Sequence, residues 1–294
     1  MEALEETLEV RPLVLERLAK TRVIGRHLNR ISSATKDLKQ TVLTSQLEGL
    51  GIRLSFLDLE GDSGHDMTFY RPLPKEQFPV INWDGVGFSD WTEGYSEESR
   101  RVDITLDNIS SELWGAWLRN NKQQPWAQYK YYRAGQIATG EYTPNAPYQW
   151  QTRGDIEAKS LYIPHCSFRI IHYIDPEEPL RRSEVLPIVA YMKWRIRQFN
   201  YVEHYVFPIL AISIFRSKAR VLQAHHDGRH LHISKSNFYD FKTNIKENYE
   251  LFARWIHSIP CGDTTTPLNI EGEMLDEHTV KQVDQYLRKT YKLS

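Results

Sequence analysis

Apolar residues recur at alternating spacings of four and three residues near the start of the chain. This series comprises Ile24, Leu28, Ile31, Thr35, Leu38 and Val42. The spacing places these side chains on one stripe of a helix, as in a coiled-coil seam or a helical hairpin. A second stripe, rotated from the first, comprises Leu43, Leu47, Leu50 and Leu54. We therefore expect residues 1–60 to form a helical element that packs on the rest of the chain, with a protein partner or self-association as the alternative.

The remainder of the chain, residues 66–294, alternates strand-like runs with helical stripes. Strands are predicted at 102–106, 156–164, 168–174 and 207–215. The last of these, FPILAISIF, is continuously apolar, which is typical of a strand buried on both faces. Helices with one apolar face are predicted at 108–121, 183–199, 244–258 and 276–291. This succession predicts a mixed sheet flanked by helices, in an α+β or α/β layer fold.

The stretch VLQAHHDGRHLHIS, residues 221–234, predicts a C-terminal β-hairpin centred on Asp227 and Gly228. An Asp-Gly pair fits a two-residue type I′ turn, because both central positions need positive φ. In that register His225 lies opposite His230. Side chains alternate across a strand, so the apolar residues of the hairpin share one face with His226, which we expect to be the core face. The apolar residues are Leu222, Ala224, Leu231 and Ile233.

Three histidines, His225, His230 and His232, share the opposite face of this hairpin. Opposed Cβ atoms in a hairpin lie about 5 Å apart, so the three imidazoles converge. Neutral imidazole binds zinc and similar ions, and three such ligands with an open fourth position form a known catalytic arrangement. A divalent metal is therefore the candidate cofactor. A solvated polar face on an outer hairpin is the simpler interpretation of the same residues.

A second candidate site follows from Asp155-Ile-Glu157-Ala-Lys159, which resembles the second half of the PD-(D/E)xK nuclease signature. Residues two apart on a strand project to the same face. Glu157 would hold a divalent cation and Lys159 would orient the attacking water, with Asp103 or Asp107 as the upstream carboxylate. The gap to these two aspartates is long, and exposed charges on an outer strand explain the motif more simply.

The charge balance excludes a surface built throughout for nucleic-acid backbones. The 294 residues include 37 Lys and Arg against 38 Asp and Glu, a formal charge of −1. A local basic patch beside the hairpin leaves a nucleic-acid partner open, although a solvated face is the favoured interpretation. The patch would comprise Lys193, Arg195, Arg197, Arg216, Lys218 and Arg220.

The acidic N-terminus, MEALEETLEV, lacks the basic start and apolar core of a secretory signal, so we expect a cytoplasmic or nuclear protein. The longest apolar run, 206–215, is about half the ~20 residues that a bilayer-spanning helix needs, so no membrane partner is expected. In such a compartment, Cys166 and Cys261 are expected to be free thiols.

The segments HYVFPILAISIF, KARVLQAHHDGRHLHISKSNFYDF and LFARWIHSIPCGDT resemble the C-terminal core of a family of uncharacterised filamentous-fungal proteins. The resemblance covers about residues 184–265. The matching positions are Ala224, Asp227, Gly228, Ser236, Tyr239, Asp240, Phe241 and Trp255. It implies a buried strand, an Asp-Gly turn and a following helix, and it brings no activity, cofactor or catalytic residue. Members of that family frequently carry aliphatic or aromatic residues at the positions of the three hairpin histidines, which argues against the metal interpretation.

These patterns favour a binding or scaffold protein, because the chain folds well and shows no complete set of catalytic residues. A metal-dependent hydrolase of the nuclease type, through Glu157 and Lys159, is the alternative. An accessory role in a secondary-metabolite pathway is a weaker alternative that depends on the fungal resemblance alone.

Overall fold

The computed structural model describes residues 2–60, 69–86, 95–119, 127–130, 149–158, 160 and 162–290. Within these ranges the chain has an α+β fold around one mixed sheet of eight strands. The strands are β2 (Ile52–Phe56), β4 (Ala127–Lys130), β5 (Trp150–Ala158), β6 (Cys166–His172), β8 (Ile209–Phe215), β9 (Lys218–His226), β10 (Leu231–Lys235) and β11 (Tyr239–Asp240). Their order across the sheet is β2-β10-β9-β8-β6-β5-β4, and β11 pairs with β9. The predicted α+β class with a mixed sheet is confirmed.

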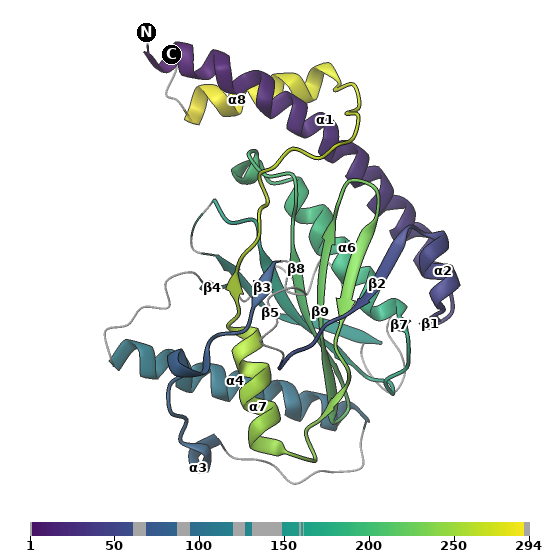
Figure 1. The fold of residues 1–294 in the computed structure, drawn as a ribbon, viewed down its shortest axis with the longest axis vertical. Helices are drawn as coiled ribbons and strands as arrows, with labels where there is room; N and C mark the ends of the chain where they lie inside the picture. Colours follow the sequence, from purple (N-terminus) through teal and green to yellow (C-terminus); the bar gives the residue numbers. More distant parts are fainter. Residues whose placement is uncertain are drawn as a thin grey trace.

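Helices cover both faces of this sheet (Figure 1). They are α1 (Glu2–Lys36), α2 (Thr44–Gly49), α3 (Trp83–Val86), α4 (Tyr95–Arg119), α6 (Arg182–Ile196), α7 (Ile245–Ile256) and α8 (Glu277–Thr290). α1 and α6 bury apolar residues against one face, and α4 and α7 bury theirs against the other. Two short ladders, β1 (Thr41–Val42) with β7 (Leu180–Arg181) and β3 (Tyr70–Arg71) with β12 (Ile259–Pro260), join connecting segments. Over the described ranges, no helix is both long enough and apolar enough to cross a membrane.

The two central strands, β6 and β8, form one of the parallel pairs that make the sheet mixed. Every residue of both strands is buried, as the continuously apolar run at 207–215 predicts for β8. β8 runs parallel to β6 with α6 as the crossover, whereas β9 returns antiparallel to β8 after a short turn. A parallel neighbour needs such a long connection and an antiparallel one does not. The helices predicted at 183–199, 244–258 and 276–291 are found as α6, α7 and α8.

The N-terminal helix is shorter than its apolar pattern predicts. α1 ends at Lys36, and the chain continues into α2 and then into the edge strand β2, which pairs in parallel with β10. Gly51 follows α2 with φ +75°, a conformation that favours glycine. Residues 52–56 then complete the hydrogen bonds of an otherwise open sheet edge. The prediction of a helical element at 1–60 therefore holds for α1 and α2 but is wrong for residues 52–56, which form β2 of the main sheet.

The apolar seam of α1 is buried within the chain itself. Ile24, Leu28 and Ile31 pack on α6 and the sheet, with exposed fractions of 1% or less. Nearer the N-terminus, Val14 packs against Val283 of α8. The helices that pack beside α1 are therefore α6 and, along its N-terminal part, α8 from the other end of the sequence (Figure 1).

Ile31→Val tests whether α1 is part of the cooperative core. Ile31 is fully buried, and removing one methylene group from such a position costs about 1 kcal/mol. We expect the free energy of unfolding to fall by this amount, with the whole circular-dichroism transition moving to lower urea concentration. Ile104→Val, at an exposed position of α4, is the matched control and should leave the transition unchanged. A separate early transition with an unchanged main midpoint would show that α1 folds independently.

α4 takes the place of an expected strand. Residues 102–106 alternate like a strand, yet they lie inside a helix that extends over Tyr95–Arg119. The buried apolar residues of this helix recur at spacings of four and three, on one helical face: Val102, Leu106, Ile109 and Leu113. A short alternation does not outweigh this longer helical period, so the strand prediction at 102–106 is wrong.

The β9–β10 hairpin keeps the predicted faces but not the predicted register. Its turn spans Asp227–His230, closed by a 3.2 Å hydrogen bond from Asp227 N to His230 O, so His225 lies opposite His232. The Asp227 carboxylate accepts the backbone N–H groups of Arg229 and His230 at 2.7 Å each, which favours the longer turn. Because the pairing moves by two residues, every side chain keeps its face, and the predicted apolar residues lie in the core.

Candidate functional site

Two of the carboxylates predicted for a nuclease site form ion pairs with arginines. Asp103 and Asp107 lie on α4, where Asp103 Oδ1 is 3.1 Å from Arg169 Nε and Asp107 also pairs with Arg169. Arg153 adds a contact of 3.2 Å to Asp103 Oδ2. Burial raises the pKa of Asp103, and the two arginines act in the opposite direction. Guanidinium groups thus stand where a nuclease would hold its cation. Lys159, the fourth predicted member, lies outside the described residues.

Glu157 faces α6, away from these aspartates. In β5 it pairs with Cys166, and its Oε1 lies 3.4 Å from Arg195 NH1 of α6. Arg169, the partner of Asp103, comes three residues after Cys166 on the same strand and therefore projects to the opposite face. The structure does not bring Glu157 together with the carboxylates of α4, because the sheet separates them.

Two of the three histidines predicted as metal ligands gather around a carboxylate. Asp227 Oδ2 lies 2.8 Å from His232 Nε2 and 3.9 Å from His230 Nδ1. His225 instead stacks on His232, with ring centroids 4.9 Å apart and an interplanar angle of 7°. An ion lies near the plane of each imidazole that binds it, so two parallel rings do not share one ion. The structure therefore replaces His225 by Asp227, which the sequence pattern assigned only to the turn.

Five of the six residues of the predicted basic patch divide into two groups, and the sixth, Lys218, is exposed at the start of β9. Arg195, Arg216 and Arg220 each form an ion pair with a carboxylate of the chain, so their charges stabilise internal contacts. Lys193 and Arg197, near the end of α6, line a cavity instead. Only these two residues of the patch therefore contribute to the site described next.

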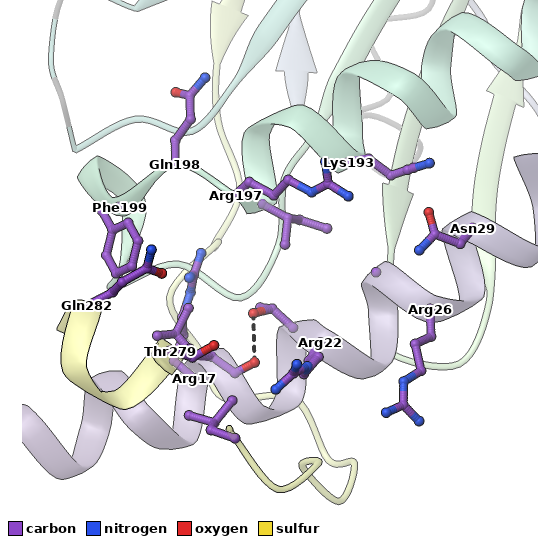
Figure 2. A pocket seen from close by; sticks show the side chains of 15 residues that line it. Arg17, Arg22, Arg26, Asn29, Lys193, Arg197, Gln198, Phe199, Thr279 and Gln282 are labelled. Carbon is purple, nitrogen blue, oxygen red and sulfur yellow. Dashed lines mark hydrogen bonds between the residues drawn. The ribbon is translucent and has the colours of Figure 1, made fainter. Parts of the chain in front are cut away.

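The cavity has a volume of about 540 Å³ and lies between α1, the end of α6, the 3₁₀ turn Phe199–Tyr201 and α8 (Figure 2). Leu18, Ile196 and Phe199 supply apolar surface. Five basic side chains line it, and within the described part of the chain no Asp or Glu does. They are Arg17, Arg22, Arg26, Lys193 and Arg197. The basic cavity thus concentrates positive charge in a protein whose net charge is close to zero.

Arg17 holds a buried positive charge at the wall of the basic cavity. Only 1% of the residue is exposed, its Nε donates to His204 O at 2.6 Å, and its guanidinium lies 5.1 Å from the Phe207 ring centre. Its two terminal nitrogens have no hydrogen-bond partner among the described residues. Burial lowers the pKa of Arg17 to about 9, so the side chain stays charged at neutral pH. A buried charge without a counter-charge costs on the order of several kcal/mol, which an anionic ligand would offset.

The remaining cations of the cavity differ in how they are paired. Arg22 and Arg26 form ion pairs of 2.6 and 2.8 Å with the segment that precedes α8. The side chains of Lys193 and Arg197 make neither a hydrogen bond nor an ion pair with any described residue (Figure 2). Burial lowers the pKa of Lys193, and the nearby Arg197 adds to that effect by repulsion. Lys193 and Arg197 are therefore the charges open to direct contact with a ligand, and Arg17 adds a buried positive charge to the wall.

Sequence reasoning missed Arg17, although a signal was present. Arg17 and Thr21 extend the seam of Ile24 and Leu28 toward the N-terminus at the same spacings of four and three. A charged residue at a core position of a helical stripe is unfavourable unless something nearby binds it. The position of α8 and the end of α6 around this residue depends on tertiary contacts, which the pattern of a single helix does not contain.

No family model matches the chain, and neither a curated protein nor a solved structure is significantly similar to it. The assignment of a site therefore depends on the geometry of the chain alone.

Proposed function

We propose that the chain is a binding protein whose ligand carries phosphate or carboxylate groups and occupies the basic cavity. The observation that carries this proposal is Arg17, a fully buried arginine whose terminal nitrogens lack an acceptor among the described residues. Natural proteins accept such an energetic cost mainly at functional sites. An anion in the cavity would supply the missing counter-charge.

The shape and lining of the basic cavity support a small organic anion. Its volume of about 540 Å³ lies within the ~300–1,000 Å³ of typical ligand pockets. Guanidinium groups bind phosphate and carboxylate through paired N–H donors, and a lysine adds a mobile point charge. Leu18, Ile196 and Phe199 would contact the apolar part of the same ligand. These features favour a ligand with an anionic group at one end and an apolar body at the other.

The other predicted functions have less support. A nuclease-type hydrolase needs Glu157 beside Asp103 or Asp107, and these residues lie on opposite sides of the sheet. A scaffold role through α1 would need its apolar seam, which α6 and α8 already cover. Binding through the basic cavity is therefore the function that we put forward for test.

Arg17→Met is expected to abolish anion binding while keeping the fold. Sodium pyrophosphate, added at constant ionic strength, should raise the Tm of the wild type, because a ligand that binds only the folded state stabilises it. The variant should show no rise. Without pyrophosphate, the variant should be at least as stable as the wild type, since methionine removes an unpaired buried charge. We expect its free energy of unfolding to lie between that of the wild type and a value about 1 kcal/mol higher. Thermal unfolding and isothermal titration calorimetry measure both effects.

Arg30→Gln provides the matched control for this experiment. Arg30 is an exposed arginine of α1 that does not line the basic cavity, so its removal should leave the pyrophosphate response unchanged. Arg197→Gln should weaken the response without destabilising the protein. A wild type that responds to neither pyrophosphate nor citrate would count against the proposal. So would an Arg17→Met variant that responds like the wild type, or one that loses several kcal/mol of stability, which would assign Arg17 to the structure.

A further inference from the structure

The tip of the β9–β10 hairpin gathers three side chains that bind metals in other proteins. One ligand atom from each of Asp227, His230 and His232 lies within 4.8 Å of the others. In a tetrahedral zinc site with bonds of about 2.0–2.2 Å, neighbouring donor atoms are roughly 3.3–3.5 Å apart. The measured separations of 2.8 Å and 3.9 Å from Asp227 Oδ2 bracket this value. Small side-chain rotations would therefore create the coordination geometry.

The surroundings hold these ligands in place. Asp227 Oδ1 accepts the N–H groups of Arg229 and His230, which leaves Oδ2 directed at the histidines. Burial raises the pKa of Asp227, but the N–H donors and His232 outweigh it, so the pKa lies well below its usual range and the carboxylate is ionised. His232 is packed flat against His225. Orientation of ligands by such neighbours is what raises metal affinity in known sites.

We propose that Asp227, His230 and His232 bind one divalent transition-metal ion of the zinc type, through one carboxylate oxygen and two imidazole nitrogens. When an ion binds His232 Nε2, the proton that this atom donates to Asp227 moves to Nδ1, so the neutral imidazole changes tautomer. Three protein ligands leave a fourth position for water or an external ligand. The site shares no residue with the basic cavity and does not depend on its function.

Arg53 opposes metal binding at this site, so its removal offers a specific test of the proposed ligands. Its NH2 lies 3.3 Å from His230 Nε2, and a donor at Nε2 favours the tautomer that carries a proton on Nδ1, the atom facing Asp227. Its charge also repels a cation. A cavity of about 480 Å³, lined by Arg53, Glu48 and His230 among others, adjoins the site and leaves room for a ligand on the metal.

The test is equilibrium zinc binding by the full chain, measured by isothermal titration calorimetry, with the visible absorption of bound cobalt as a reporter of coordination. We expect one equivalent of zinc in the wild type. His232→Gln and Asp227→Asn should each weaken zinc binding by roughly 100-fold or more. Arg53→Gln should tighten it roughly tenfold, a gain that a purely structural role of these residues would not produce.

His225→Phe is the matched control, because phenylalanine keeps the flat packing against His232 and removes only the imidazole nitrogens. Its zinc affinity should equal that of the wild type. An equal loss in His225→Phe and His232→Gln would overturn the proposed ligand set in favour of three histidines. A wild type that binds no zinc, or affinity that survives both His232→Gln and Asp227→Asn in folded variants, would overturn the site itself.

Discussion

Acidification from about pH 7 to about pH 5 is expected to unfold the protein. Six of its eleven histidines are kept neutral in the folded state. Burial lowers the pKa of His172, His226 and His257 to about 3, and that of His165, His204 and His225 to about 4. Neutral buried histidines that must take up protons are a common cause of acid denaturation.

The direction of this change in stability follows from the pH at which the folded and unfolded states each bind a proton. The unfolded chain protonates these histidines near pH 6.5, and the folded chain does so only near pH 4 or pH 3. The unfolded state therefore binds more protons below about pH 6.5, so the stability is fully present above this pH and falls as the pH falls. At pH 5 each histidine with a pKa of about 3 costs about 2 kcal/mol, and three of them cost about 6 kcal/mol, comparable to the ~5–15 kcal/mol of a typical domain.

His226 illustrates why the folded state excludes the proton. Gly228 N donates to His226 Nδ1 at 3.0 Å, His226 Nε2 lies 2.8 Å from His27 Nδ1, and His27 Nε2 lies 2.9 Å from Leu50 O. This series is satisfied when His226 donates to His27 and His27 donates to the carbonyl. A proton on His226 Nδ1 would face the Gly228 N–H group, so protonation breaks this hydrogen bond at the tip of the hairpin.

Urea unfolding followed by tryptophan fluorescence at several pH values between 7.5 and 5 measures the effect, with a chelator present so that metal binding does not contribute. His226→Leu should reduce the pH dependence by about one proton. His278→Gln, at an exposed position of α8, should leave it unchanged. Equal free energies of unfolding at pH 7 and pH 5 would contradict the expectation.

The parts of the fold that the sequence predicts are those whose signal lies within one element. β8 is apolar except for Ser213 and is buried on both faces, and the apolar residues of α6 recur along the helix, which ends three residues before the predicted position. The predictions fail where a segment is defined by a distant neighbour. β2 is a strand because β10 offers it an open edge, and α1 pairs with α8, nearly the whole chain away. The periodicity of apolar residues within one segment does not indicate which distant segment it will contact.

The candidate sites show the same division. Alternation along a strand predicts the correct faces of the hairpin, but the register depends on how the Asp227 side chain bonds to its own turn, so the pattern alone does not place Asp227 beside His230 and His232. Glu157 and Asp103 were paired because of their chemistry. Their separation follows from the face of the sheet that each helix covers, which residue spacing does not determine.

Glu184→Ala is expected to lower the free energy of unfolding by about 3 kcal/mol, because it removes the buried counter-charge of Arg220 and leaves only the half-exposed Glu178 to pair with it. Glu184 and Arg220 have fully buried side chains and form an ion pair beneath the first turn of α6. Glu184 Oε1 accepts Arg220 Nε at 2.8 Å and the Ser213 hydroxyl at 2.7 Å, and Oε2 accepts the Arg181 N–H at 2.9 Å. Burial raises the pKa of Glu184 but Arg220 lowers it further, so the carboxylate is ionised.

A double variant separates two contributions to the free energy of unfolding: the cost of removing the counter-charge of Arg220, and the stabilisation from the ion pair itself. Glu184→Leu combined with Arg220→Met removes both charges, and such replacements are often neutral or stabilising. Ser213 and the Arg181 N–H still lose an acceptor, at about 1–3 kcal/mol each, so we expect the double variant to recover only part of the loss. Glu177→Ala, which removes an exposed partner of Arg181, is the control and should cost less than about 1 kcal/mol. If the double variant were less stable than Glu184→Ala, Arg220 would stabilise the protein independently of Glu184, through its ion pair with Glu178 and its contact with the Phe238 ring, and the expectation would be wrong.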